Sequence, residues 1–340
     1  MKQMKKTTYI LLALASFIVA ACSKPSPDGP TPIGPESPKS YIFFEAGILD
    51  VAETKVNLLT GKSLPADAGT AFGVIGYYED GQPIFNSYSN NIANVYRKEK
   101  NGVFQYDNLA PWMGSTHTFY GFYPHDLLKE NVKVADNVPY IEHTQPTSES
   151  GMKDILGAYK QVTDTYAFAP VVMQFQHLLW AFNITIKNSQ TKELTGSGEI
   201  DNPSITIKEV TFELLDFPKS ASFKLDADFS VALASETIDP SYTIYSAGTD
   251  QIASGHEKTY GPLLFIPVNN LRYRVTVKYA TQGGVEGTMV YPAAGQYKTL
   301  STGFTPGKVY NLAITKTNDK FFVGIGVEDW DSLEFEHSFN

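Results

Sequence analysis

The stretch Leu271-Arg-Tyr-Arg-Val-Thr-Val-Lys-Tyr279 alternates apolar and polar side chains from end to end. One parity carries Leu, Tyr and Val, and the other carries Arg, Thr and Lys. Because successive side chains of a β-strand point to opposite faces, this pattern predicts a half-buried antiparallel strand.

Two later stretches repeat the pattern. Tyr310, Leu312 and Ile314 share one parity, after a Thr-Pro-Gly-Lys turn at 305–308 in which Pro sets φ and Gly tolerates a positive φ. Residues 321–327 place Phe, Val, Ile and Val at every second position. The C-terminal part of the chain is therefore predicted to be a succession of strands.

Two other apolar runs change phase along their length. Within residues 171–187, Met173 and Phe175 share one parity, whereas Phe182 and Ile184 share the other. A strand there must bulge, bend or pass between sheets near residues 177–181. A similar slip falls between residues 207 and 210. Strands that change faces are typical of β-sandwiches.

The composition agrees with an all-β fold. Of 340 residues, 42% are hydrophobic, 19% are charged and 13% are aromatic, and the aromatics are mostly Tyr (20) and Phe (21), which suit pleated sheets. We expect two β-sandwich domains in tandem, at 41–195 and 196–340, with the boundary in the Gly- and Pro-containing gap at 187–202. Residues 150–162 are expected to form a short helix or a loop.

Charge and motifs exclude several functions. With 27 Lys and Arg against 36 Asp and Glu, the net charge of −9 argues against nucleic-acid binding. The sequence contains no phosphate-binding Gly loop, no His-Glu-x-x-His and no Gly-x-Ser-x-Gly. We therefore expect no enzymatic activity, no catalytic residues, no cofactor and no metal site.

A few polar residues in apolar or acidic surroundings need an interpretation. His177 is expected to be a core histidine bonded to backbone rather than a metal ligand. The carboxylates at 226 and 228, and those at 328, 329 and 331, could bind calcium, but a solvated loop is the favoured interpretation because calcium needs six to eight oxygen ligands.

The N-terminus predicts export. Lysines at positions 2, 5 and 6 precede an uncharged stretch at 10–21, which is too short to cross a bilayer as a helix and is typical of a signal peptide at 1–21. Val19-Ala20-Ala21 precedes Cys22, the single cysteine of the chain. This resembles the pattern of bacterial lipoproteins, so we expect Cys22 to carry the lipid anchor.

Residues 22–40 are predicted to be a lipidated, disordered linker. Six prolines lie between 24 and 39, and such a segment favours extended polyproline II over packing. Ser23 follows the cysteine in place of an inner-membrane retention Asp. We therefore expect an outer-membrane lipoprotein, with cell-surface exposure favoured although Lys24 and Pro25 depart from the acidic surface-export signal.

Several segments together resemble the fimbrillins, the type V pilin lipoproteins of Gram-negative anaerobes. These segments are Phe72-Gly-Val-Ile-Gly-Tyr-Tyr78, Thr118-Phe-Tyr-Gly-Phe-Tyr-Pro124, Asp154-Ile-Leu-Gly-Ala158, Met173-Gln-Phe-Gln-His-Leu-Leu-Trp-Ala-Phe-Asn-Ile184, Pro306-Gly-Lys-Val-Tyr-Asn-Leu312 and Val327-Glu-Asp-Trp330. The resemblance implies two transthyretin-like β-sandwich domains, no enzymatic activity and a role in a surface fimbria that supports adhesion.

The resemblance also implies assembly by strand complementation with other pilin subunits, in a homo- or hetero-polymer. A protease removes the first strand of such pilins, and a strand of another subunit fills the groove. Here the candidate first strand is 41–46, with Tyr41, Ile42, Phe43 and Phe44 at its start.

The maturation site and the donor strand each keep alternatives. Pilin cleavage after an arginine has no counterpart here, since the first arginine after Cys22 is Arg97, so the candidate sites are Lys55 and Lys62, either of which could be a simple loop lysine. At the other end, Leu333, Phe335 and Phe339 alternate with polar residues. They predict either a donor strand or, as we favour, a last strand of the second domain.

A surface glycan-binding lipoprotein is the alternative from another class. Such proteins present exposed aromatic platforms. Trp180 and Trp330 lie in strand-like runs and are predicted to be core, whereas Trp112 follows Pro111 and could form such a platform. No other residue of the sequence supports a glycan ligand.

Overall fold

Strand β21 (Leu271–Thr281) contains the alternating stretch and pairs antiparallel with β13 (Ile205–Leu214) and β22 (Glu286–Tyr291). Leu271, Tyr273, Val275 and Val277 are buried, which confirms the predicted half-buried antiparallel strand. The structure is a computed structural model, and it describes residues 41–48, 64–163, 170–190, 193–195, 198–200, 203–301, 303–317 and 320–329.

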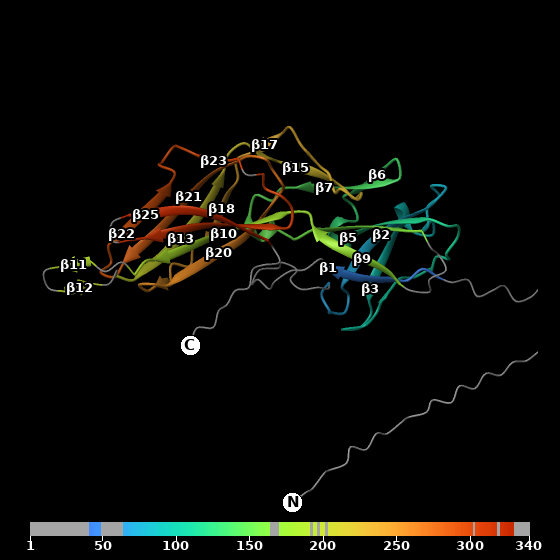
Figure 1. Cartoon of the computed structure of the whole chain (residues 1–340), viewed down its shortest axis with the longest axis horizontal. Coiled ribbons are helices and arrows are strands. Elements are labelled where there is room, and N and C mark those ends of the chain that lie inside the picture. Colours follow the sequence, from blue (N-terminus) through green and yellow to red (C-terminus); the bar gives the residue numbers. More distant parts are fainter. Residues whose placement is uncertain are drawn as a thin grey trace, which may run out of the picture. The chain divides into compact units, whose positions relative to one another are not determined.

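The described residues are almost all in strands and turns, and they confirm the all-β class (Figure 1). The helical elements among them are single turns: η1 (Ser89–Asn91), α1 (His125–Leu128) and η2 (Glu149–Gly151). No helix in this part of the chain is long and apolar enough to cross a membrane.

A seven-stranded sheet comes first in the chain. Its spatial order is β1 (Phe44–Ile48), β9 (Val171–His177), β8 (Leu156–Val162), β5 (His117–Tyr123), β2 (Ala71–Tyr78), β3 (Ile92–Arg97) and β4 (Phe104–Gln105). All its neighbouring pairs are antiparallel except β1 and β9.

Two further sheets form a sandwich. One has the order β20 (Glu257–Phe265), β10 (Trp180–Asn188), β24 (Lys308–Lys316) and β25 (Phe321–Asp329). The other has the order β18 (Ser241–Tyr245), β13, β21 and β22, with β19 (Asp250–Ile252) and β23 (Lys298–Leu300) on the same sheet. Their inner faces share one apolar core, in which the rings of Phe182 and Phe212 stack at 4.5 Å.

Smaller sheets complete the fold. A four-stranded sheet has the order β16 (Val231–Leu233), β15 (Ser220–Lys224), β7 (Val138–Thr144) and β6 (Val132–Ala135). Two-stranded pairs are formed by β11 (Glu193–Thr195) with β12 (Gly198–Ile200) and by β14 (Phe217–Pro218) with β17 (Thr237–Ile238). The pairing of β7 with β15 joins residues from both sides of the expected boundary at 195/196, and the division at that point stays a prediction.

Both predicted phase changes have a structural counterpart. The run at 171–187 leaves the seven-stranded sheet at His177 and enters the sandwich at Trp180, so β9 and β10 belong to different sheets. The slip between 207 and 210 is a register shift in the ladder of β13 and β21, between Ile207 and Glu209. The expectation for 150–162 is wrong in part, because only η2 is helical and residues 156–162 form β8, inside the seven-stranded sheet.

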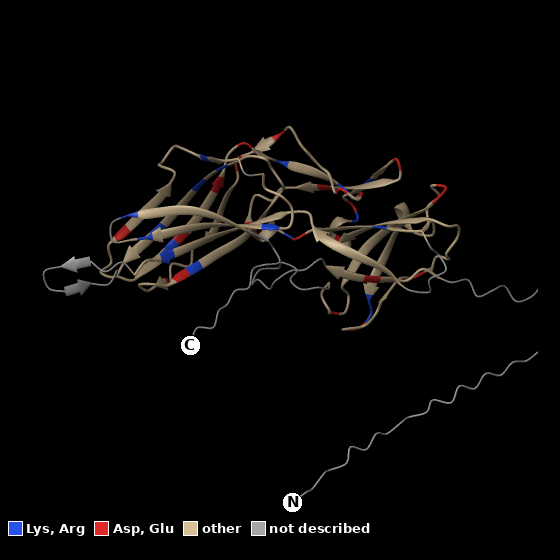
Figure 2. Cartoon of the chain, in the orientation of Figure 1, with Lys and Arg blue, Asp and Glu red and all other residues tan. Residues whose placement is uncertain are grey.

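Charged side chains pair across strands on the outer face of the β13–β21 ladder. Arg274 contacts Glu213 at 2.7 Å, and Lys278 contacts Glu209 at 2.8 Å, each opposite its partner in the register. Figure 2 shows basic residues interspersed among acidic ones along these strands. Opposite charges that face one another across a ladder favour this register over its neighbours.

Candidate functional site

Strand β1 lies at one edge of the seven-stranded sheet, and its ladder partner among the described residues is β9 (Figure 1). The two strands run parallel, with Phe44 opposite Val171 and Ile48 opposite Phe175. Ile42, Phe44 and Ile48 point into the core and are buried, whereas Phe43 is 47% exposed. We call the groove that holds Ile42, Phe44 and Ile48 the β1 seat.

Hydrogen bonds hold the residues just before β1 on both sides. On one side, the Val171 amide donates to the Phe43 carbonyl at 2.7 Å. On the other side, the Ile42 amide donates to the Ala110 carbonyl at 2.9 Å, and the Tyr106 hydroxyl donates to the Ile42 carbonyl at 2.8 Å. The residues just before β1 thus lie between β9 and the segment that follows β4, although the regular strand begins only at Phe44 rather than at the predicted Tyr41.

Aromatic rings line the β1 seat. The ring of Phe44 lies 6.1 Å from Phe85, 5.7 Å from Tyr106 and 5.4 Å from Phe119. Burial raises the pKa of Tyr106, so its hydroxyl stays protonated and keeps its role as a donor. Burying a side chain such as Phe or Ile contributes about 1.5–3 kcal/mol. An empty β1 seat would therefore expose a costly apolar surface, and any strand with the same apolar spacing would be stabilised in it.

A groove of about 470 Å³ runs beside β1 on its solvent side. Phe43 and Glu45 of the β1 segment line one side of it, and Arg97, Val103 and Phe104 line the other. The guanidinium of Arg97 lies over the Phe104 ring at 4.0 Å, and Val103 is 84% exposed. The seat of β1 is therefore reached from solvent along this groove.

Strand β25 forms a second edge, in the sandwich. Its ladder partner among the described residues is β24, with which it pairs antiparallel over its full length. Phe321, Val323 and Ile325 pack only partly against the core, and Phe322 is 58% exposed. An edge of this kind presents unpaired backbone groups that another strand can bond.

Most of the sequence-predicted site residues lie outside the described residues. These are the lipidation candidate Cys22, the candidate cleavage sites Lys55 and Lys62, and the C-terminal strand candidates Leu333, Phe335 and Phe339. The candidate first strand is described, and the structure puts Tyr41 in a bridge to Pro111 and brings Ile42 and Phe44 into the β1 seat.

Several other expectations have an outcome in the structure. Trp180 is fully buried in the core, as predicted, and its indole donates to the Ile266 carbonyl at 2.8 Å, while Trp330 lies outside the described residues. The prediction of an exposed aromatic platform at Trp112 is wrong. The side chain is partly buried, because its ring packs edge-on against His117 at 4.8 Å and against Phe119.

The polar residues of the sequence analysis have structural partners. His177 is buried as predicted, but the partner of its Nδ1 differs from the expected backbone group, because this atom lies 2.9 Å from the buried carboxylate of Asp154. Asp226 is paired with Lys224 at 2.6 Å. Among the residues that the structure describes, no three His, Cys, Asp or Glu side chains are placed to hold a metal ion.

Sequence reasoning missed the parts of the β1 seat that come from elsewhere in the chain. Nothing in residues 41–48 indicates that their partner is β9 or that the pairing is parallel. Tyr106 belongs to a short polar segment without strand periodicity, so only its aromatic character was a signal. These contacts depend on topology rather than on local pattern.

The fold and the β1 seat define an all-β protein whose first strand is held at a sheet edge by side-chain burial and a few backbone bonds. The sequence matches the family described as fimbrillin-like over residues 56–330, and the chain belongs to that family. Membership supports a role as a fimbrial subunit at the cell surface, a structural role rather than an enzymatic one.

Solved structures of two Bacteroides proteins have the same fold. A fimbrial protein from Bacteroides vulgatus superposes with a TM-score of 0.55 at 16% identity, over 85% of this chain and 99% of that chain. A protein described as a cell adhesion protein from Bacteroides ovatus gives a TM-score of 0.51 at 15% identity, over 85% of this chain and 97% of that chain. No curated protein matches the sequence.

Proposed function

We propose that this chain is a structural or accessory subunit of a cell-surface fimbria that supports adhesion. It is exported as an outer-membrane lipoprotein through Cys22 and joins other subunits by strand complementation, without catalytic activity. The observation that carries the proposal is the β1 seat, a groove whose occupant is a single edge strand with three buried side chains.

The apolar spacing of the C-terminal segment supports a donor role. In the β1 segment the buried side chains Ile42, Phe44 and Ile48 follow one another at offsets of two and four residues. Leu333, Phe335 and Phe339 have the same offsets. A strand that enters the seat parallel to β9 would thus put Leu333 in the place of Ile42, Phe335 in that of Phe44 and Phe339 in that of Ile48.

The same alignment assigns two of the intervening positions as follows. Glu336 takes the place of Glu45, which faces solvent, so a carboxylate replaces a carboxylate. His337 takes the place of Ala46, which is only partly buried, and a larger side chain there is tolerated at the open side of the groove. The alternative that this segment is an integral last strand predicts no such match with β1.

Cleavage at Lys55 or Lys62 would free the seat. Both lysines lie between the end of β1 at Ile48 and the start of β2 at Ala71. After a cut there, β1 would be retained by non-covalent contacts, such as those with β9, Tyr106 and Phe119, and a second copy of the chain could compete for the groove.

A disulfide that forms only in the proposed register tests this arrangement. Val172 lies opposite Glu45 in the β1–β9 ladder, so the proposal puts Glu336 of another copy opposite Val172. Val172→Cys and Glu336→Cys are combined in a chain that carries Cys22→Ser, treated with trypsin and oxidised. We expect a ladder of covalent multimers on a non-reducing gel, because facing residues meet the distance requirement of a disulfide.

The control moves one cysteine along β9. Gln174 lies opposite Gly47, two residues from Val172. Gln174→Cys with Glu336→Cys is expected to cross-link poorly, and Gln174→Cys with Ser338→Cys is expected to restore the ladder. If the treated chain stays monomeric, or if all pairs cross-link alike, assembly through the β1 seat is wrong.

A further inference from the structure

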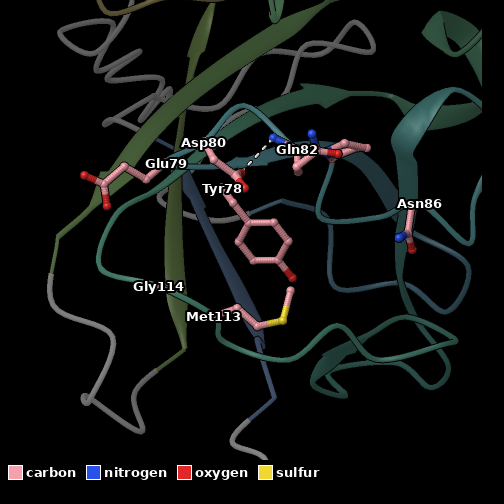
Figure 3. Close-up of a pocket in the computed structure, with 8 residues that line it drawn as sticks. Tyr78, Glu79, Asp80, Gln82, Asn86, Met113 and Gly114 are labelled. Carbon is pink, nitrogen blue, oxygen red and sulfur yellow. Dashed lines mark hydrogen bonds between the residues drawn. The ribbon is translucent and has the colours of Figure 1, made fainter.

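A pocket of about 630 Å³ opens at one end of the seven-stranded sheet, between the residues that follow β2 and the loop before β5 (Figure 3). It is lined by Tyr78, Glu79, Asp80, Gln82, Asn86 and Met113, and we call it the Tyr78 pocket. Its volume lies within the range of small-molecule sites. None of these residues belongs to the β1 seat.

The walls of the Tyr78 pocket are held in place before any ligand arrives. The hydroxyl of Tyr78 donates to the Pro111 carbonyl at 3.1 Å, and its ring packs edge-on against His117 at 5.2 Å. The backbone N–H of Gln82 donates to the Asp80 carboxylate at 3.0 Å. A site with fixed walls loses less conformational entropy on binding than a mobile one does.

Asn91 fixes the strand-to-helix connection that carries most of the lining. It has a positive φ of 58°, and its side chain donates to the Gly76 carbonyl at 2.8 Å and accepts from the Phe85 amide at 2.7 Å. Left-handed backbone is tolerated best by Asn and Gly, so this position suits Asn. Asn91 therefore ties the connection to β2 and to its own middle at Phe85.

The chemistry of the lining selects against anions. Two carboxylates and no Lys or Arg line the pocket, so a phosphate, sulfate or carboxylate ligand would meet repulsion and no charged donor. Figure 3 shows the side chains of Glu79 and Asp80 pointing in different directions. An ammonium group needs acceptors that converge on one point, so a cation is also a poor match.

A neutral polyol fits the remaining chemistry. The amides of Gln82 and Asn86 supply both donors and acceptors, the Asp80 carboxylate supplies acceptors, and hydroxyl groups can serve either role. Figure 3 shows the Tyr78 ring at the centre of the pocket beside the side chain of Met113, which together form an apolar surface. Saccharides combine hydroxyl edges with an apolar C–H face.

We propose that the Tyr78 pocket binds a neutral saccharide, with the sugar ring against Tyr78 and Met113 and its hydroxyls bonded to Asp80, Gln82 and Asn86. Burial, with a smaller contribution from the charge of Asp80, raises the pKa of Tyr78, so its hydroxyl stays protonated and keeps donating to Pro111. The subunit would then carry its own adhesion site, separate from its polymer contacts.

Methionine methyl NMR of the purified chain tests the proposal directly. Met113 lines the pocket and is 52% exposed, whereas Met152, Met173 and Met289 are buried and serve as internal references. The probes are mannotriose, cellotriose and N-acetylchitotriose, with 3′-sialyllactose as an anionic probe and N-acetyl-lysine methylamide as a cationic one. We expect at least one neutral trisaccharide to shift the Met113 signal, assigned with Met113→Leu, and to leave the reference signals unchanged.

Variants at exposed positions separate specific from incidental binding. Asn86→Ala and Gln82→Ala are each expected to lower the affinity for the saccharide by about fivefold or more, because each removes hydrogen bonds to the ligand. Asn270→Ala and Gln251→Ala remove the same side chains from exposed positions elsewhere and are expected to leave the affinity unchanged. The proposal is overturned if no neutral saccharide shifts Met113 up to about 10 mM, if only a charged probe does, or if the pocket variants bind as the controls do.

Discussion

The hydroxyl of Tyr106 donates a 2.8 Å hydrogen bond to the carbonyl of Ile42 and is buried with it. The same oxygen accepts a bond from the Ala110 amide at 3.2 Å. One side chain therefore joins the segment that enters β1 to the loop that follows β4. Because Ile42 is two residues from Phe44, this contact fixes the position at which the first strand enters its seat.

Tyr106→Phe is expected to loosen β1 and leave the rest of the fold in place. It keeps the ring that packs on Phe44 but leaves the Ile42 carbonyl and the Ala110 amide without their hydroxyl partner, at a cost of about 1–3 kcal/mol. Hydrogen exchange should become faster in residues 42–48 than in β2 or β5. Tyr140→Phe on β7, in a different sheet, is the matched control, and equal protection of β1 in both variants would contradict the expectation.

Gly73→Ala is expected to destabilise the seven-stranded sheet. Gly73 lies opposite Phe122 in the β2–β5 ladder, and a Cβ built on it would lie 2.0 Å from the Phe122 ring. The ring must move within a packed core, which costs about 1–3 kcal/mol. Urea unfolding should give a lower midpoint. Gly324→Ala on β25, where a Cβ meets no atom within 4 Å, should leave the midpoint unchanged or raise it.

The alternating strands were the predictable part of the fold. The burial of Leu271 and Val275, the change of sheet between His177 and Trp180, and the register slip after Ile207 all follow from side-chain parity, since parity fixes which face meets the core. Strand β8 was not predictable, because its sequence Leu156–Val162 has small and polar residues without a clear period.

The candidate site was predictable only in its local half. The apolar residues Ile42 and Phe44 indicate a buried strand. Its partners β9 and Tyr106 depend on long-range topology, which no local periodicity predicts. The prediction of an exposed platform at Trp112 was wrong for a related reason. Neither Pro111 nor the residues after it indicate that His117 and Phe119 pack against the indole.

Gln145→Leu is expected to be strongly destabilising although it is close to isosteric. The buried Gln145 side chain donates to the Leu264 carbonyl at 3.0 Å and accepts from the Ile266 amide at 3.1 Å. Leucine would leave both backbone groups buried and unpaired, at a cost of about 1–3 kcal/mol each. Urea unfolding measures the loss. Gln251 is exposed, so Gln251→Leu should have little effect on the free energy of unfolding. A similar loss in that variant would contradict the explanation by the two unpaired backbone groups.

The free energy of unfolding is expected to decrease as the pH is lowered from about 6.5 to about 4. Burial lowers the pKa of His143 to about 4, so in this window the unfolded chain binds a proton that the folded chain does not. Stability from this group is complete above about pH 6.5 and declines by up to about 3 kcal/mol as the pH falls to 4. His117 and His125, whose pKa values burial also lowers, act in the same direction.

Substitution of His143 isolates its contribution to this pH dependence. His143→Gln is expected to flatten the pH dependence of the urea midpoint between pH 4 and 6.5, since it removes the group whose folded pKa lies near 4. His256→Gln, at an exposed position, is the control and should leave the slope as it is in the parent chain. An unchanged slope in His143→Gln would show that other groups determine it.

Charge on β25, an edge strand among the described residues, is expected to suppress self-association without affecting the fold. Phe322 and Val327 are 58% and 52% exposed on a strand whose ladder partner in the described part of the chain is β24 alone. Lysine at an edge hinders the pairing of one edge with another, so Phe322→Lys with Val327→Lys should lower light scattering at high concentration. The free energy of unfolding measured in urea should stay within about 0.5 kcal/mol of that of the parent chain. Val285→Lys changes a residue that is 68% exposed outside any strand, so it adds charge without touching the edge. If this control suppresses scattering as well as the edge variant does, net charge rather than the edge of β25 accounts for the effect.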